Sequence, residues 1–138
     1  MITLTESARV TAGIVLLTIV GIEYGGLFLV RTLRADLGLT DFQRSFFRAG
    51  HAHAGVLVIL GLVCLLLTGA TSLTGFWRWL AGTGALIAAI LMSAGFFVSA
   101  IGAGRTRPNR FIALLFAGAA MLAGGVVTLG IGLLVAPA

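Results

Sequence analysis

Residues 49–70 read AGHAHAGVLVILGLVCLLLTGA, and this stretch contains no Asp, Glu, Lys or Arg. A helix of about 20 apolar residues is long enough to cross the roughly 30 Å hydrocarbon core of a bilayer. The chain has three further apolar runs of this kind, at residues 10–30, 79–103 and 111–136. Only one acidic or basic residue, Glu23, interrupts any of the four runs. The sequence therefore predicts an all-α polytopic membrane protein with four transmembrane helices.

The overall composition excludes an ordinary water-soluble domain. Of the 138 residues, 59% are hydrophobic and 9% are charged, and the mean hydropathy is +1.15. A soluble domain carries about a quarter charged residues, so this chain lacks the polar surface to cover a globule in water. All nine basic residues are arginines that flank the apolar runs, which indicates anionic lipid headgroups as partners and argues against nucleic acid. The single cysteine, Cys64, excludes an intrachain disulfide.

The arginines also predict the orientation in the membrane. The connections after the first and third runs hold seven of them, whereas Arg9 and Arg78 are the two elsewhere. The positive-inside rule then puts these two connections in the cytoplasm and both termini outside the plasma membrane of a bacterial cell. Glu6 before the first run, Glu23 within it and the lack of a prompt small-residue cleavage site favour a retained helix over a signal peptide.

Short connections predict one integral membrane domain over residues 1–138, folded as an up-down-up-down bundle. Gly38 fits the glycine that ends a helix, and Thr40-Asp-Phe-Gln43 fits a capping box that starts the next one. Pro108 fits the first turn of the last helix. The four helices are expected at about residues 8–37, 41–70, 76–103 and 108–136.

Twenty glycines and many alanines point to close helix packing, because small residues let helix backbones approach each other in a membrane. Gly21 and Gly25 form one small-xxx-small pair in the first helix. Two longer stripes occur, and one of them is expected to be the interface of a homo-oligomer, although the spacing does not say which. The third-helix stripe is Ala81, Ala85, Ala88, Gly95, Ser99 and Gly102, and the fourth-helix stripe is Ala113, Ala117, Ala120, Gly124 and Thr128.

Glu23 and His53 are predicted to lie at nearly the same depth in the membrane. If the first two helices fold about Leu39, with about 1.5 Å of rise per residue, Glu23 is level with Gly55 and His53 with Gly25. The two side chains then differ by roughly 3 Å in depth, which permits a hydrogen bond. Such a pair reduces the cost of both polar groups in lipid and can hold and release a proton. The alternative is that the two groups only satisfy each other.

His51 and His53 point in nearly opposite directions, because two residues turn a helix by about 200°. They are therefore excluded as joint ligands of one metal ion, or as both axial ligands of one haem, within a protomer. His53 shares its face with small residues such as Gly50 and Gly61, which predicts that it faces the bundle interior. His51 shares its face with Arg48 and is expected to face a neighbouring helix, another protomer or the cytoplasmic interface.

The remaining polar residues complete the candidate site. Tyr24 joins Glu23, His51 and His53 as a proton- or ligand-binding residue, with a packing aromatic as its alternative. Thr18 and Ser93 are expected to bond the backbone of their own helices. The sequence requires no cofactor, but haem or a transition metal held by His53 with Glu23 stays open. Contacts with anionic lipid, or with an anionic substrate, are predicted for Arg44, Arg48, Arg105, Arg107 and Arg110.

The segment Phe47-Arg-Ala-Gly-His-Ala-His-Ala-Gly55 resembles a motif of uncharacterised small four-span membrane proteins of actinobacterial type. The layout is also similar to the membrane-associated eicosanoid and glutathione metabolism proteins, in which Arg48 would match the arginine that opens helix two. The Asn and Glu that this second family carries downstream are absent here.

A lone carboxylate in the first helix, Glu23, resembles that of the small multidrug resistance transporters. The resemblance implies a role in binding a proton and a drug, while the long first connection and the histidine pair depart from that family. The His-Ala-His helix is similar to helices of oxidase-like haem proteins. That resemblance implies a haem held between subunits or by a single histidine.

Three classes of function follow. The first is an oligomeric proton- or ion-linked transporter, or an accessory subunit, that uses Glu23 and His53. The second is a metal- or haem-binding redox protein. The third is a membrane enzyme acting on an anionic or lipid-like substrate at the cytoplasmic face, near Arg44, Arg48 and His51. The first is preferred, so the protein is expected not to be an enzyme.

Overall fold

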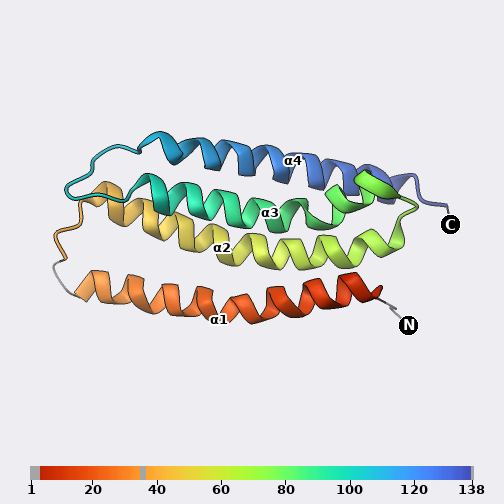
Figure 1. The fold of residues 1–138 in the computed structure, drawn as a ribbon, viewed down its shortest axis with the longest axis horizontal. Helices are drawn as coiled ribbons and strands as arrows, with labels where there is room; N and C mark the ends of the chain where they lie inside the picture. The colour runs from red at the N-terminus through yellow and green to blue at the C-terminus, as the bar shows by residue number, and fades with distance from the viewer. Residues whose placement is uncertain (1–3, 35–36, 138) are drawn as a thin grey trace.

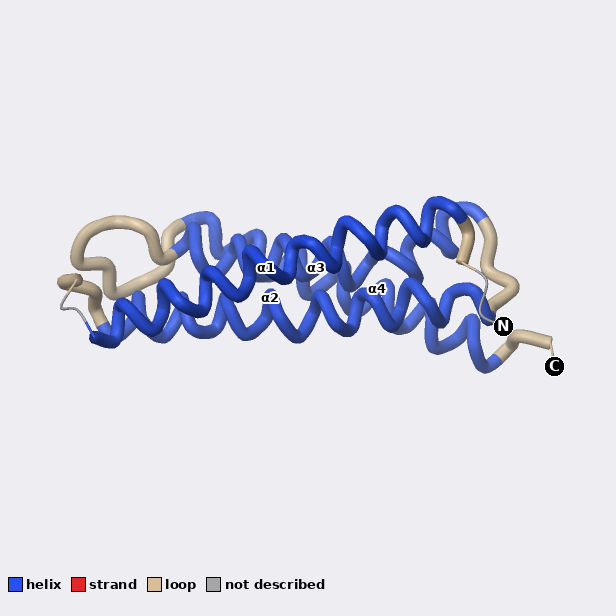
Figure 2. The backbone as a smooth tube through the Cα atoms, turned by 90° about the horizontal axis from the view of Figure 1, so that it is seen from below, coloured by secondary structure: helices blue, strands red, loops and turns tan. Residues whose placement is uncertain are grey.

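The structure, a computed structural model, describes residues 4–34 and 37–137 and consists there of helices and connections without a strand. It confirms the predicted all-α class, and each of the four long helices is apolar and long enough to cross a membrane. Figures 1 and 2 show them side by side along their length. The long helices are α1 (Glu6–Arg34), α2 (Asp41–Leu67), α3 (Gly75–Ser99) and α4 (Ala113–Leu134), with short 3₁₀ helices η1 (Thr68–Ala70) and η2 (Arg110–Ile112).

The connections divide the molecule into two chemically different ends. The first and third connections lie together, at the left of Figure 1, and we call this side the arginine-rich end. Both termini and the connection between α2 and α3 lie at the opposite side, which we call the terminal end. This arrangement is the predicted alternation of four antiparallel helices.

The predicted capping box is present at the start of α2. The Thr40 hydroxyl accepts a hydrogen bond from the Gln43 backbone N–H at 3.2 Å, and the Gln43 side-chain oxygen accepts one from the Thr40 N–H at 3.2 Å. The Gln43 amide also donates to the carbonyls of Ala100 at 2.9 Å and Gly102 at 2.8 Å. Gln43, only 3% exposed, thereby fastens the start of α2 to the end of α3.

Several predicted helix boundaries differ from the structure. The predicted extension of the first helix to residue 37 includes residues 35–36, which lie outside the described residues. The third helix ends at Ser99 rather than at residue 103, because Gly102 and Gly104 adopt positive φ angles of 126° and 62° that an α-helix does not allow. The prediction that Pro108 lies in the first turn of the last helix is wrong: the helical segment begins at Arg110 of η2, where the Asn109 side chain caps it by accepting from the Phe111 N–H at 2.9 Å.

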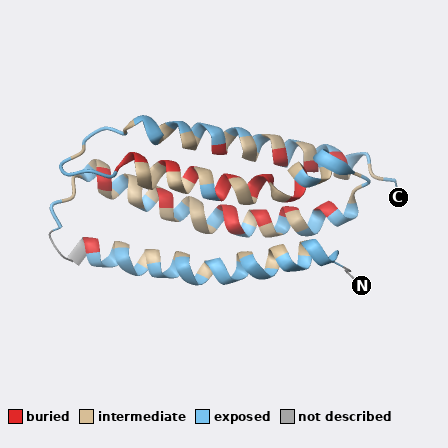
Figure 3. Cartoon of the chain, in the orientation of Figure 1, coloured by how far each residue is buried: buried red, intermediate tan, exposed pale blue. Residues whose placement is uncertain are grey.

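Helices α2, α3 and α4 form the closely packed part of the molecule. A Cβ atom built on Gly95 of α3 would lie 2.6 Å from the Leu115 backbone nitrogen of α4, and one on Gly118 would lie 2.9 Å from the Met92 nitrogen. The backbones of α3 and α4 therefore approach each other at positions where no side chain fits. Figure 3 shows that buried residues are concentrated on α2 and α3.

The two small-residue stripes differ in their exposure. The α3 stripe faces the interior, since Ala88 and Ser99 are both 0% exposed and Ala81, Ala85 and Gly95 are buried as well. Gly102 belongs to the following connection. Most of the α4 stripe faces outward, with Ala113, Ala117 and Ala120 exposed.

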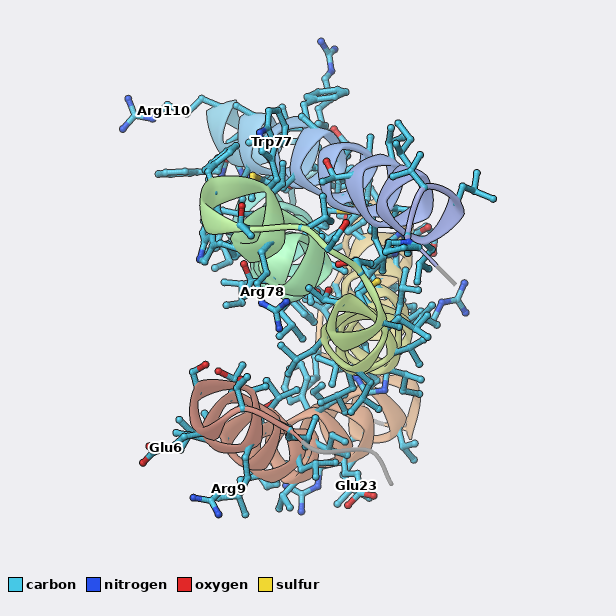
Figure 4. All side chains as sticks on the ribbon, turned by 90° about the vertical axis from the view of Figure 1, so that its right-hand side faces the viewer. Glu6, Arg9, Glu23, Trp77, Arg78 and Arg110 are labelled. Carbon is cyan, nitrogen blue, oxygen red and sulfur yellow. The ribbon has the colours of Figure 1, made fainter. Side chains whose placement is uncertain are left out.

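Helix α1 stands apart from this packed unit. Its backbone approaches α2, whereas among the described helices it approaches neither α3 nor α4. No residue from Glu6 to Arg31 is buried. Its side chains Val15, Ile19 and Ile22 pack on a core cluster that α2 and α3 provide. Figure 4, a view along the helices, shows α1 at the end of a zigzag order α1, α2, α3, α4.

Candidate functional site

His53 faces the contact between α2 and α3, as the sequence predicted for the interior. Its Nδ1 lies 2.8 Å from the Ala49 carbonyl oxygen one turn earlier. Since a carbonyl only accepts hydrogen bonds, Nδ1 is the donor in this contact. The imidazole packs against Phe96 of α3 with ring centroids 4.8 Å apart. The Phe96 ring also packs against the Phe46 ring, and their centroids are 5.5 Å apart.

His51 points the other way and fits into a notch on α1. A Cβ built on Gly26 would lie 3.2 Å from both Cε1 and Nε2 of the ring, and one on Gly25 would lie 3.6 Å from Nδ1. The missing side chains of these two glycines therefore make the space that the imidazole occupies. This contact is the neighbouring-helix alternative among the three environments expected for His51.

Glu23 lies on the surface of α1 rather than in the bundle. Its side chain is exposed, and Figure 4 shows it on the side of α1 that faces away from the other helices. Ile22 packs on the core, and one further residue turns the helix by about 100°, which carries the carboxylate off the packed face. Within the described part of the chain, no hydrogen bond or ion pair joins Glu23 to any residue.

The proposed pairing of Glu23 with His53 is therefore not formed within this protomer. The predicted depth is close: His51 contacts Gly25 and Gly26, whereas folding about Leu39 places it level with Leu27. The rotation of α1 about its own axis is what separates the two groups, since the glycines and not Glu23 face α2. The predicted depth along the helix axis is thus correct to within two residues, whereas the predicted direction of the carboxylate is wrong.

Tyr24 lies on the same outward surface as Glu23. Its side chain is 68% exposed, and it stands about 200° from Ile22 around the helix. It makes no hydrogen bond with the described residues. Glu23 and Tyr24 consequently present an acceptor and a donor next to each other on the outside of the protomer.

The arginines of the arginine-rich end have separate surroundings. Arg44 donates from Nε to the Leu39 carbonyl at 3.2 Å, and Arg105 donates from Nε to the Ile101 carbonyl at 2.7 Å. Arg48 and Arg107 are exposed. The exposed Arg110 guanidinium lies over the Phe111 ring, 5.4 Å from its centroid. They surround this end of the molecule without converging on one point with His51.

The hypothesis of a metal site gains no support from the described residues, in which no three His, Cys, Asp or Glu side chains come together. His53 and Glu23 point to different surroundings, so one protomer does not bring them to a common ion. Met92 packs against Gly118 in the contact between α3 and α4.

The predicted hydrogen bonds of Ser93 and Thr18 to their own helices have different outcomes. The buried Ser93 hydroxyl has no partner among the described residues, whereas Thr18 donates to the Val15 carbonyl at 2.6 Å as predicted.

Sequence reasoning missed two partners of the histidines, Phe96 and the glycine pair of α1. The adjacent glycines Gly25 and Gly26 were a usable signal, since they lie within two residues of the predicted level of His51. Phe96 lies in an apolar run without a polar face and had no comparable signal. Comparison with protein-family models, curated proteins and solved structures finds no match to this chain.

Proposed function

We propose that the protein is a homo-oligomeric, proton- or ion-linked membrane subunit, a transporter or an accessory subunit, in which Glu23 of α1 is the protonatable group at the contact between copies. The observation that supports this proposal is the outward position of Glu23. It lies within one turn of the middle of α1, is exposed and has no partner among the described residues.

A carboxylate in this position is costly in lipid. A charged side chain at the centre of a membrane helix costs about 2.5–3.5 kcal/mol on insertion scales, so such groups usually pair, face a protein interior or take up a proton. The α1 surface offers the means for a pair, because Tyr24 supplies a phenol donor beside the carboxylate. In a two-fold symmetric contact each copy provides both groups to the other. The phenol of one copy then donates to Glu23 of the second.

In such an oligomer, the proton is the ligand that binds to the interface and is released from it. When Glu23 takes up a proton, the charge is lost and the hydrogen bond with Tyr24 changes its direction. Transport or partner activation that depends on this step would respond to pH. In the proposed orientation the arginine-rich end lies in the cytoplasm of a bacterial cell, and both termini lie outside the plasma membrane.

The oligomer is tested by disulfide formation in membranes. With Cys64→Ala as the background, Val20→Cys on the outer face of α1 is expected to form cross-linked dimers, whereas Ala117→Cys on the exposed face of α4 is the matched control. A hydrogen bond between membrane helices contributes about 1–2 kcal/mol, so Glu23→Leu should weaken association roughly tenfold. Equal cross-linking at Val20 and Ala117 would contradict the α1 interface.

The proton-linked role is tested in liposomes. Reconstituted wild-type protein is expected to carry a pH-gradient-driven proton flux, measured with an enclosed pH-sensitive dye. Glu23→Gln should abolish this flux while dimers still form, since an amide also accepts from Tyr24. His53→Ala should leave the flux intact, because His53 faces α3. Flux in Glu23→Gln equal to wild type, or no flux in wild type, rejects this role.

A further inference from the structure

A long trough runs between α1, α2 and α3, on the side of α1 opposite to Glu23. Toward the terminal end it forms a cavity of about 390 Å³ between the first turns of α1, the end of α2 and the start of α3. Toward the middle of the membrane it continues as a second cavity of about 360 Å³. Both volumes fall in the range of small-molecule sites. The backbones of α1 and α3, whose side chains line both cavities, do not approach each other.

The two cavities lie end to end along the same three helices. On α1 the lining passes from Thr11 to Ile14, and on α3 it passes from Thr83 to Leu86. Each step is three residues, or roughly 4.5 Å of helix rise. The two cavities therefore follow each other along α1 and α3, from the terminal end toward the middle of the bundle.

The outer cavity is polar and basic. Hydroxyl groups of Thr5, Ser7, Thr11 and Thr83 line it, and Arg78 is the charged residue of its wall. Figure 4 shows Arg78 directed from α3 toward the α1 side. In the described residues the Arg78 guanidinium has no hydrogen bond or ion pair, and no carboxylate lines the cavity. The Thr83 hydroxyl already donates to the Trp79 carbonyl at 2.7 Å. The wall thus offers an uncompensated positive charge beside the hydroxyls of Thr5, Ser7 and Thr11, which fit an anionic phosphate.

The inner cavity is apolar and narrow. Branched side chains such as Ile14, Val58 and Ile90 form its walls, and the small residues Ala54 and Ala89 leave the space between them. From Leu86 to Ser93, the lining residues of this cavity on α3, the helix rises about 10.5 Å, which is roughly two thirds of the depth of one leaflet of the roughly 30 Å hydrocarbon core. The length and the chemistry of this section fit one hydrocarbon chain of a lipid from a single leaflet.

We infer that the trough between α1 and α3 binds one anionic phospholipid, with its phosphate at Arg78 and one acyl chain along the section from Ile14 to Ser93. The site differs from the general attraction of lipid by the arginine-rich end, because it lies at the opposite end and combines a headgroup position with a shaped chain path. The lipid would fill the gap that leaves α1 in contact with α2 alone. This inference does not depend on Glu23 or on the oligomer.

The site is tested with a photoactivatable phosphatidylglycerol that carries a diazirine on its acyl chain, incorporated with the full-length protein into lipid nanodiscs. After illumination, mass spectrometry of peptides is expected to find adducts in residues 14–22 and 86–93. The same label on phosphatidylcholine should give roughly tenfold less adduct at these residues, since the charge-assisted hydrogen bonds of the headgroup are weaker.

Matched variants distinguish a specific lipid-binding site from nonspecific electrostatic attraction of lipid. Arg78→Gln should lower the labelling of these peptides roughly tenfold, whereas Arg9→Gln should not change it. Arg9 is a suitable control because it lies at the same end but faces away from the other helices (Figure 4). Thr18→Phe, which fills the inner cavity from α1, should also block labelling, whereas Ala120→Phe on the exposed face of α4 should not.

Several outcomes would overturn the inference. Labelling spread evenly over the outer surfaces of α1 and α4 would show ordinary boundary lipid. Equal losses in Arg78→Gln and Arg9→Gln would show nonspecific charge. Competition by glycerol phosphate, which has the phosphate but no chain, would show that a free phosphate is the ligand and that the chain path is not used.

Discussion

The contact between α3 and α4 and the contact between α1 and α2 both depend on glycine, yet they use it differently. In the first, Gly84, Gly95, Gly118 and Gly125 let two backbones touch along most of their length. In the second, Gly25 and Gly26 provide a notch for one imidazole ring, and the next glycine along, Gly21, has open space around it. The α3–α4 contact is thus one of backbone against backbone, whereas α1 is attached by one notch and by the side chains of Val15, Ile19 and Ile22.

The largest loss of unfolding free energy is expected where the backbones of α3 and α4 touch. Gly95→Ala would put a Cβ 2.6 Å from the Leu115 nitrogen, and a backbone atom cannot move away as a flexible side chain can. Overpacking of this kind costs about 1–3 kcal/mol, and we expect the upper part of that range. The measurement is reversible unfolding in mixed micelles, with Gly130→Ala, in open space on α4, as the control. Equal changes in both variants would contradict close α3–α4 packing.

A smaller loss of unfolding free energy is expected at Gln43. We call its hydrogen bonds from α2 to the end of α3 the clasp. Gln43→Leu removes two donors to the carbonyls of Ala100 and Gly102 and one acceptor for the Thr40 N–H. Leaving buried polar groups without partners costs about 1–3 kcal/mol, so the free energy of unfolding should fall by about 2 kcal/mol. Ser45→Ala, an exposed neighbour on α2, serves as the comparison. A loss no greater than in Ser45→Ala would show that water replaces the clasp.

The smallest effect on the whole molecule is expected at the notch. Gly26→Val would collide with the His51 ring and move α1 away from α2, while α2, α3 and α4 stay packed. Spin labels on Ile14 and Ile59 should report a broader distance distribution, with a change in unfolding free energy of under about 1 kcal/mol. Gly21→Val should leave the distances unchanged. A narrow, wild-type distribution in Gly26→Val would show that the ring adapts.

The sequence predicts positions along the membrane normal well and directions around each helix poorly. Apolar run length located all four spans, and Thr40 with Gln43 located the start of α2, because length and capping are local properties. The outward direction of Glu23 was missed. A helix that is apolar on all sides has no polar face to orient it in lipid, so the notch at Gly26 decides the rotation, and that depends on His51 of another helix.

The stripes of small residues teach the same point. Ala85 of α3 and Ala117 of α4 have identical chemistry and similar spacing to their neighbours, yet one is buried and the other is exposed. The difference comes from Gly118 and Gly125, which turn another face of α4 toward α3. Whether a stripe is internal therefore depends on a competing stripe of still smaller residues on the same helix.

The clasp at Gln43 also has a consequence for biosynthesis. Its partners Ala100 and Gly102 are 57 and 59 residues later in the chain. At a translation rate of about 5–20 residues per second, the amide waits roughly 3–12 s for them. Until Ala100 and Gly102 have been synthesised, water or lipid headgroups must satisfy the Gln43 amide. The hydrogen bonds of the clasp therefore form only when the third helix has crossed the membrane in the correct direction.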